Sequence, residues 1–100
     1  MYVLMTYDVK AKRTEKFKKL LRRYLGHIQY SVFSGDLSEA KLIEVRRSIS
    51  RLLLPGELVT EITAANRKNV KVVHIMKDES GKGEAKRHED NSHSTDYRVL

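Results

Sequence analysis

A single short segment, Tyr2–Asp8, most constrains how this chain can fold. Up to its terminal aspartate it consists of aromatic, aliphatic and β-branched residues, which is typical of a β-strand. Successive side chains of a strand point to opposite faces, and both faces of this strand are largely apolar. Any sheet built around it therefore needs cover on both sides.

Two amphipathic helices are available to provide that cover. Thr14–Leu25 carries apolar residues at helical spacing from Phe17 onward. Glu39–Leu53 has the same character, with Ser38 as a favourable N-cap and a Pro-Gly pair just beyond its end. Two such helices cover one face of a small sheet. In a chain of 100 residues we expect a second copy of the chain to cover the other face.

Three further segments are predicted to be strands: His27–Phe33, Glu57–Thr63 and Val70–Met76. Ser34–Asp36 should break or bend the first of them, and a short extra strand near Phe33–Leu37 is also compatible with the pattern. The order of elements indicates an α+β fold, the ferredoxin-like βαββαβ arrangement with an extra C-terminal edge strand. A surplus edge strand commonly pairs with a partner's sheet, so we predict a homodimer formed through sheet packing.

The charge divides the chain into two parts. Residues 1–76 hold fifteen Lys and Arg against seven Asp and Glu, a net charge of +8, whereas residues 77–100 have a net charge of −1. We predict one domain over 1–76, followed by a polar tail over 77–100 that is disordered when alone. The charge of the domain favours a polyanionic partner, nucleic acid before membrane, although a surplus of this size also serves solubility.

Several classes of protein are excluded by what the sequence lacks. There is no cysteine, which rules out disulfide scaffolds, cysteine-ligated zinc and thiol catalysis. The longest uncharged apolar stretch, Tyr2–Tyr7, is far shorter than the roughly 20 residues that span a bilayer. No signal-peptide pattern opens the sequence. We therefore expect a cytoplasmic protein without a membrane partner.

The first predicted helix and the turn before it are strongly basic. Between Lys10 and Arg23 there are eight basic residues and one acidic residue. Many charged helix faces are simply solvated, but this one has few intrahelical ion pairs available, which favours a surface that faces phosphates. The candidate nucleic-acid-binding residues on this helix are Lys16, Lys19, Arg22 and Arg23.

Asp8 is the candidate for metal chemistry. It is the only acidic residue among the first fourteen, and it ends an apolar strand beside a basic segment. A carboxylate in this position suits Mg²⁺, which takes oxygen ligands and keeps several waters, although the side chain could instead only cap the turn. A two-fold axis nearby would bring a second Asp8. Two carboxylates with open water positions suit metal-assisted hydrolysis of a phosphodiester.

The aromatic and histidine residues allow two interpretations. Tyr7, Tyr30 and Phe33 could stack on bases, as in sheet-based RNA binders, but the aromatic-rich signature of an RNA-recognition strand is absent. Positions in the core or in an interface are the alternative. The histidines lack the helical pairing of zinc proteases, so His27 is expected to be a packed or edge residue of a strand.

Three segments resemble the CRISPR-associated protein 2 family: YVLMTYDV at the start, RTEKFKKLLRRYL in the first helix and HIQYSVFSGDL before the second. The resemblance spans roughly residues 1–63. It implies a homodimeric ferredoxin-like protein that joins the CRISPR-associated protein 1 integrase to capture and insert spacer DNA. It also implies a Mg²⁺-dependent endonuclease acting on single-stranded RNA or on duplex DNA.

The resemblance also implies roles for particular residues. Asp8 matches the family's metal-binding aspartate, which two subunits share, and Tyr7 and Phe33 match positions of the active cleft. Arg13 corresponds to a basic, nucleic-acid-binding position at the start of the first helix, and His27 stands where some members have an arginine. Two alternatives remain: a non-catalytic structural adaptor of the integrase complex, and a VapD-type toxin ribonuclease, which shares the fold.

Overall fold

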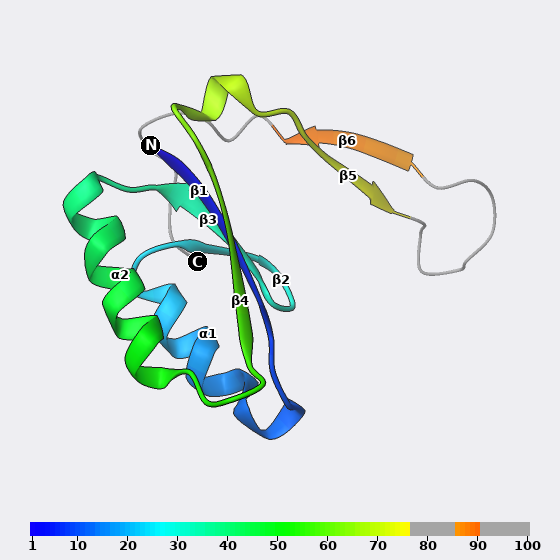
Figure 1. The fold of residues 1–100 in the computed structure, drawn as a ribbon. Helices are drawn as coiled ribbons and strands as arrows, with labels where there is room; N and C mark the ends of the chain where they lie inside the picture. Colours follow the sequence, from blue (N-terminus) through cyan, green and yellow to red (C-terminus); the bar gives the residue numbers. More distant parts are fainter. Residues whose placement is uncertain (77–85, 91–100) are drawn as a thin grey trace.

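The computed structural model of the chain describes residues 1–76 and 86–90. Two helices are interleaved with four strands over the first two thirds of the sequence, and further strands follow (Figure 1). The elements in chain order are β1 (Tyr2–Asp8), the 3-10 turn η1 (Ala11–Arg13), α1 (Thr14–Arg22), β2 (Gly26–Gln29), β3 (Val32–Asp36), α2 (Glu39–Leu52), β4 (Leu58–Ala64), the 3-10 turn η2 (Arg67–Asn69), β5 (Val72–Met76) and β6 (Lys86–Asp90).

Four strands form one antiparallel sheet in the order β2-β3-β1-β4. The two-faced apolar strand β1 lies inside this sheet, because β3 and β4 pair with its two edges. Its register with β4 runs from Tyr2 opposite Ala64 to Asp8 opposite Leu58. The strand order and the interleaved helices are those of the ferredoxin-like fold, which confirms the predicted α+β class.

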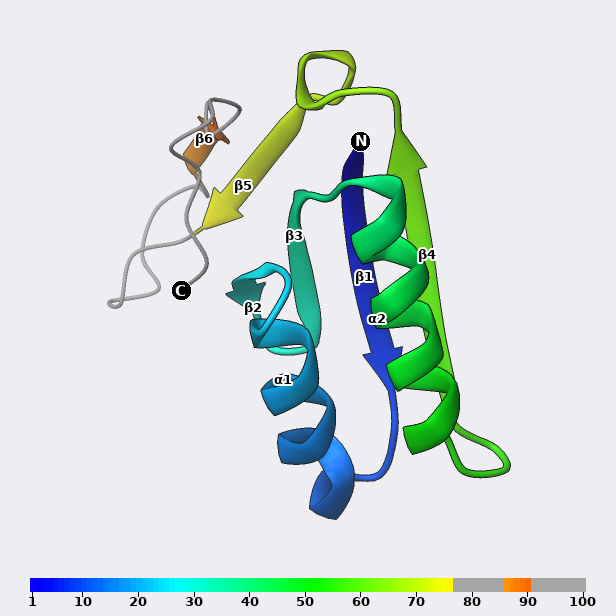
Figure 2. The ribbon, with the colours of Figure 1, turned by 90° about the vertical axis from the view of Figure 1, so that its left-hand side faces the viewer.

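Both helices pack on the same face of the sheet, which we call the helix face (Figure 2). The alternation in β1 sends Val3, Met5 and Tyr7 into the core. They meet the apolar stripes of the two helices there; the buried helix residues are Phe17, Leu21, Leu42, Val45 and Ile49. Among the described helices, neither α1 nor α2 combines the length and apolar character that a membrane span needs.

The start of α2 follows the local signals in the sequence. The Ser38 hydroxyl accepts a hydrogen bond from the Lys41 backbone N–H at 3.2 Å, which is the predicted N-cap. Leu37 before the cap and Leu42 inside the helix are both buried in the core cluster. The helix therefore begins where the sequence predicts.

The opposite side of the sheet, which we call the open face, carries no helix among the described residues (Figure 1). Leu58 and Ile62 of β4 are 57% and 58% exposed there. Leu4 of β1 lies directly opposite Ile62, so the apolar surface continues across the two strands. An exposed apolar strip of this kind is what the predicted homodimer would cover.

The predicted strand His27–Phe33 is wrong as a single strand. It is a hairpin in which β2 ends at Gln29 and β3 begins at Val32. Tyr30 turns the chain with a φ of 39°, in the region that normally favours Gly or Asn. The sequence therefore has no turn signal at this point. Ser34–Asp36 continue β3 instead of breaking it, close to the extra strand allowed near Phe33–Leu37.

β5 and β6 form a separate two-stranded sheet, from Val72 opposite Asp90 to Met76 opposite Lys86. Residues 86–90 thus depart from the expectation of a disordered tail, because strand pairing uses backbone hydrogen bonds and does not require apolar side chains. One edge of β5, the predicted C-terminal edge strand, is therefore paired with β6 of the same chain. Residues 77–85 and 91–100 of the predicted tail lie outside the described residues, and the domain boundary at residue 76 stays a prediction.

Candidate nucleic-acid and metal site

The end of β1 opens onto a cavity between the β1–η1 turn and the α2–β4 loop. We call it the Asp8 cavity; its lining residues are Asp8, Val9, Lys10, Lys12, Arg13, Leu54, Pro55, Gly56 and Glu57. The Asp8 side chain is exposed and makes no hydrogen bond or ion pair with the part of the chain that the structure describes. No side chain caps η1, so the interpretation of Asp8 as a turn cap finds no support.

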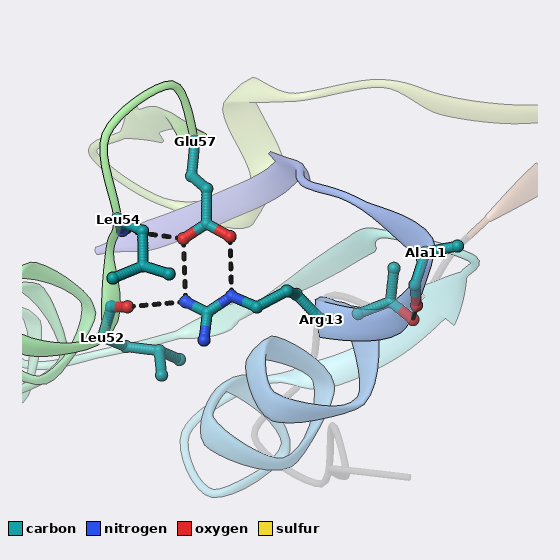
Figure 3. Close-up of polar contacts among 6 residues, drawn as sticks. Ala11, Arg13, Leu52, Leu54 and Glu57 are labelled. Carbon is teal, nitrogen blue, oxygen red and sulfur yellow. Dashed lines mark hydrogen bonds and ion pairs between the residues drawn. The ribbon is translucent and has the colours of Figure 1, made fainter.

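Glu57 forms a two-point ion pair with Arg13 in the wall of this cavity (Figure 3). Glu57 was not singled out from the sequence. Arg13 Nε donates to Glu57 Oε2 and Arg13 Nη2 donates to Glu57 Oε1, both at 2.8 Å. Nη2 also donates to the Leu52 carbonyl at 2.8 Å, and the Leu54 N–H donates to Glu57 Oε1 at 2.7 Å. The hydrogen bonds from Arg13 are the main cause that lowers the pKa of Glu57 to about 2.

Most of the Arg13 side chain is therefore engaged within the chain, and its contact with nucleic acid stays a prediction. Its side chain is only 15% exposed, and its guanidinium lies 5.6 Å above the Phe17 ring. Its Nε and Nη2 donors are used by Glu57 and by the Leu52 carbonyl, and no hydrogen bond from Nη1 occurs among the described residues. Arg13 ties the start of α1 to the loop between α2 and β4, and so shapes one wall of the Asp8 cavity.

The Asp8 cavity offers oxygen ligands for a divalent cation. Of its two carboxylates, Glu57 is held by Arg13, which leaves Asp8 as the available oxygen ligand. No group of three or more potential ligands occurs among residues 1–76 and 86–90. Asp8 lies opposite Leu58 and therefore on the open face, where a second subunit could add its own Asp8. This donor set fits Mg²⁺, which binds through one or two carboxylates and keeps several waters.

Tyr7 lies on the other side of the strand. Its ring packs on the helix face, with ring centroids 5.5 Å from Phe17 and 6.1 Å from Phe33. Burial is the main cause that raises the pKa of Tyr7, and the charge of Glu15 adds to it. Because adjacent residues of a strand point to opposite faces, the structure does not bring Tyr7 and Asp8 into one cavity.

Phe33 does not contact solvent at all. It is fully buried in the core, and its ring stacks on His27 at 4.6 Å. The expectation that Phe33 belongs to an active cleft is wrong in the sense of a substrate contact, because no substrate can reach its ring. Its role is to support Tyr7 and His27 from behind.

A second cavity, which we call the hairpin cavity, lies between the start of α1 and the β2–β3 hairpin. Its volume is about 460 Å³, and its lining residues are Tyr7, Thr14, Glu15, Lys18, His27, Tyr30 and Ser31. Polar side chains from β1, α1 and the hairpin thus converge on one space.

Two basic residues of α1 and the arginine that follows it line a groove between the two helices. We call it the basic groove; its lining residues are Lys16, Lys19, Leu20, Arg23, Ser48, Arg51 and Leu52. Three of the predicted nucleic-acid-binding residues therefore lie together, whereas Arg22 is exposed outside the groove. Arg51 comes from α2 and was missed, because helix periodicity alone does not show which faces of two helices meet. None of the four basic residues forms an ion pair within the described ranges.

The chain is similar to known proteins over most of its described length. The family model for the CRISPR associated protein Cas2 matches residues 1–72. The CRISPR-associated endoribonuclease Cas2 of Haloferax volcanii is 44% identical over 59 residues, 59% of this chain and 69% of that protein. The Thermotoga maritima protein of the same name is 45% identical over 53 residues, 53% of this chain and 61% of that protein. The chain thus spans between three fifths and seven tenths of the length of these curated relatives.

Solved structures agree with the fold. A crystal structure of Cas2 superposes with a TM-score of 0.60 at 39% identity, covering 62% of this chain and 71% of that one. The Cas2 of Streptococcus pyogenes gives a TM-score of 0.62 at 22% identity, covering 72% of this chain and 98% of that one. The family match extends over more than half of the sequence, from the first strand to the start of β5. The chain belongs to the CRISPR associated protein Cas2 family.

Proposed function

We propose that this chain is a CRISPR-associated endonuclease that binds nucleic acid and works as a homodimer in spacer acquisition. The observation that carries the proposal is Asp8, an exposed carboxylate without a partner in the described structure, at the end of a central strand and beside basic residues. The relatives named endoribonuclease Cas2 support the nuclease activity.

In this proposal Asp8 holds Mg²⁺ together with Asp8 of a second subunit. The bound ion would supply an activated water and neutralise charge that develops on the phosphodiester. Lys10 and Lys12 line the same cavity and would attract the phosphate backbone. The ion pair between Arg13 and Glu57 keeps the wall of the cavity in place and keeps Glu57 from competing for the metal.

The basic groove is the proposed contact for the backbone of duplex DNA. Its four cations lie on two helices that the core holds together. Contacts of this kind are made with phosphates and do not read base sequence. In this proposal the chain joins the CRISPR-associated protein 1 integrase and holds spacer DNA. Spacer DNA can have any sequence, so binding through phosphates suits this task. Arg22 would add long-range attraction from its exposed position next to the groove.

Cleavage should be measured on duplex DNA and on single-stranded RNA while Mg²⁺ is titrated. We expect Asp8→Asn to lower cleavage by about 100-fold or more, because the ion loses its carboxylate ligand. Asp36→Asn is the matched control, since Asp36 is an exposed aspartate at the end of β3. It should leave cleavage unchanged. Light scattering should first establish the oligomeric state of each variant.

Three outcomes would redirect the proposal. Equal cleavage by both variants would place the activity elsewhere or in a contaminant. No cleavage by wild type, together with duplex binding and a stable complex with the integrase, would identify a structural adaptor. Growth arrest upon expression that Asp8→Asn relieves would favour a toxin ribonuclease acting alone.

A further inference from the structure

The hairpin cavity is not used by the chemistry proposed for Asp8. It lies on the helix side of β1, whereas Asp8 lies on the open face. Its volume of about 460 Å³ falls within the usual range of small-ligand sites, roughly 300–1,000 Å³. Glu15 and Lys18, which form an ion pair at 3.9 Å, are the carboxylate and the ammonium group of its lining. Because these charges offset each other, the cavity suits a neutral polar group better than a free phosphate.

Tyr30 provides an aromatic platform at the rim of this cavity. It is 89% exposed, although a large apolar ring in a tight hairpin normally packs against something. Its φ of 39° is unfavourable for an aromatic residue, and strained backbone of this kind clusters at ligand-binding sites. His27 Nε2 lies 2.7 Å from the Tyr30 carbonyl oxygen, and the His27 ring stacks on the buried Phe33. The turn that presents Tyr30 is thereby anchored to the core.

Tyr7 provides a hydrogen-bonding group inside the cavity. The residue is 8% exposed, and its hydroxyl has no hydrogen-bond partner among the described residues. The Ser31 hydroxyl lies 3.1 Å from the Thr6 hydroxyl and retains capacity for a further hydrogen bond.

We propose that the hairpin cavity binds one unpaired nucleobase of a single-stranded nucleic acid. The base stacks on Tyr30, and its edge meets the Tyr7 hydroxyl and the Glu15–Lys18 pair. A base inside a duplex is already stacked and paired, so only an unpaired base can enter. The inference rests on the proposed nucleic-acid function and adds to it a contact for one unpaired base.

The test uses the Asp8→Asn protein without divalent cations, so that no cleavage occurs. Fluorescence anisotropy measures binding of a labelled hexauridylate, its deoxy counterpart and a duplex of 20 base pairs. Tyr30→Asn removes the ring but tolerates the positive φ, so the variant should melt at the same temperature or higher. Tyr30→Phe keeps the ring. We expect Tyr30→Asn to weaken the binding of both hexamers by roughly 5- to 100-fold, which corresponds to the loss of one stacked base.

The hexamer affinities of Tyr30→Phe should remain within about twofold of those of the parent protein. The duplex affinity should be unchanged in both variants. Hexamer affinities that Tyr30→Asn leaves unchanged, or that fall in parallel with duplex affinity, would overturn the inference. Asp8-dependent cleavage measured in the Tyr30→Asn protein distinguishes this failure from failure of the proposed function. If cleavage persists while hexamer binding is insensitive to Tyr30, the nuclease stands and the base site does not.

Discussion

At the scale of single residues, the fold lowers the pKa of Glu57 more than that of any other described carboxyl group. Its pKa falls from an ordinary 4.5 to about 2, because Arg13 and the Leu54 N–H hydrogen-bond to the ionised form. A carboxyl with a depressed pKa contributes stability that is complete above its unfolded pKa. That contribution is lost as pH falls through the interval toward the folded value.

This linkage predicts how stability depends on pH. Glu57→Gln should lower the melting temperature by several degrees at pH 7, because Arg13 loses its counter-ion. The difference from wild type should shrink between pH 5 and pH 2, where the unfolded carboxyl and then the folded one become protonated. Thermal unfolding followed by circular dichroism across this range checks the expectation.

The exposed pair of Arg46 and Glu61 provides the control for that measurement. Arg46 is 52% exposed, and ion pairs in such positions contribute little because water screens them. Glu61→Gln should therefore change the melting temperature at pH 7 by less than Glu57→Gln does. A difference between wild type and Glu57→Gln that stays constant down to pH 2 would contradict the role assigned to Glu57.

At the scale of elements, the groove between α1 and α2 concentrates positive charge from two helices. Arg51→Glu should weaken binding of a 20-base-pair duplex and reduce the slope of log affinity against log salt by about one to two. Arg47→Glu changes the net charge by the same amount from an exposed position of α2 outside the groove. We expect it to have the smaller effect in the same anisotropy titration.

The comparison of these two variants separates a localised site from a diffuse field. If Arg51→Glu and Arg47→Glu weaken binding equally, the groove is not the contact and the whole charge of the domain is responsible. A duplex affinity that is the same at low and moderate salt would argue against any phosphate contact.

At the scale of the whole molecule, the open face of the sheet is the surface expected to join two subunits. Ile62→Lys places a charge in the centre of its apolar strip, so the variant should be monomeric at micromolar concentration by light scattering. Cleavage should fall with it, since each metal site would then have one Asp8. Ile43→Lys is the control, because Ile43 is 48% exposed on α2, the helix that covers the other face of the sheet. A wild-type protein that is itself monomeric at this concentration would contradict the prediction.

Local signals in the sequence were sufficient for most of the fold. Apolar periodicity located both helices, the Ser38 cap set the start of α2, and the two-faced pattern of Tyr2–Asp8 identified a strand that needs cover on both sides. The hairpin at Tyr30 was not predictable, since a tyrosine at positive φ has no local signature and is held by contacts from His27. The strand Lys86–Asp90 was also missed, because its partner β5 and not its own composition makes it a strand.

The sequence by itself determined the fold class and the family resemblance, and it singled out Asp8 as a candidate, because these depend on neighbours along the chain. Only the tertiary structure decided which side chains share a space. It paired Arg13 with Glu57 across 44 positions, added Arg51 to the basic groove and buried Phe33 in the core. It also separated Tyr7 from Asp8. Contacts between distant residues depend on how helices and strands pack in three dimensions, and periodicity within one element carries no information about the element that faces it.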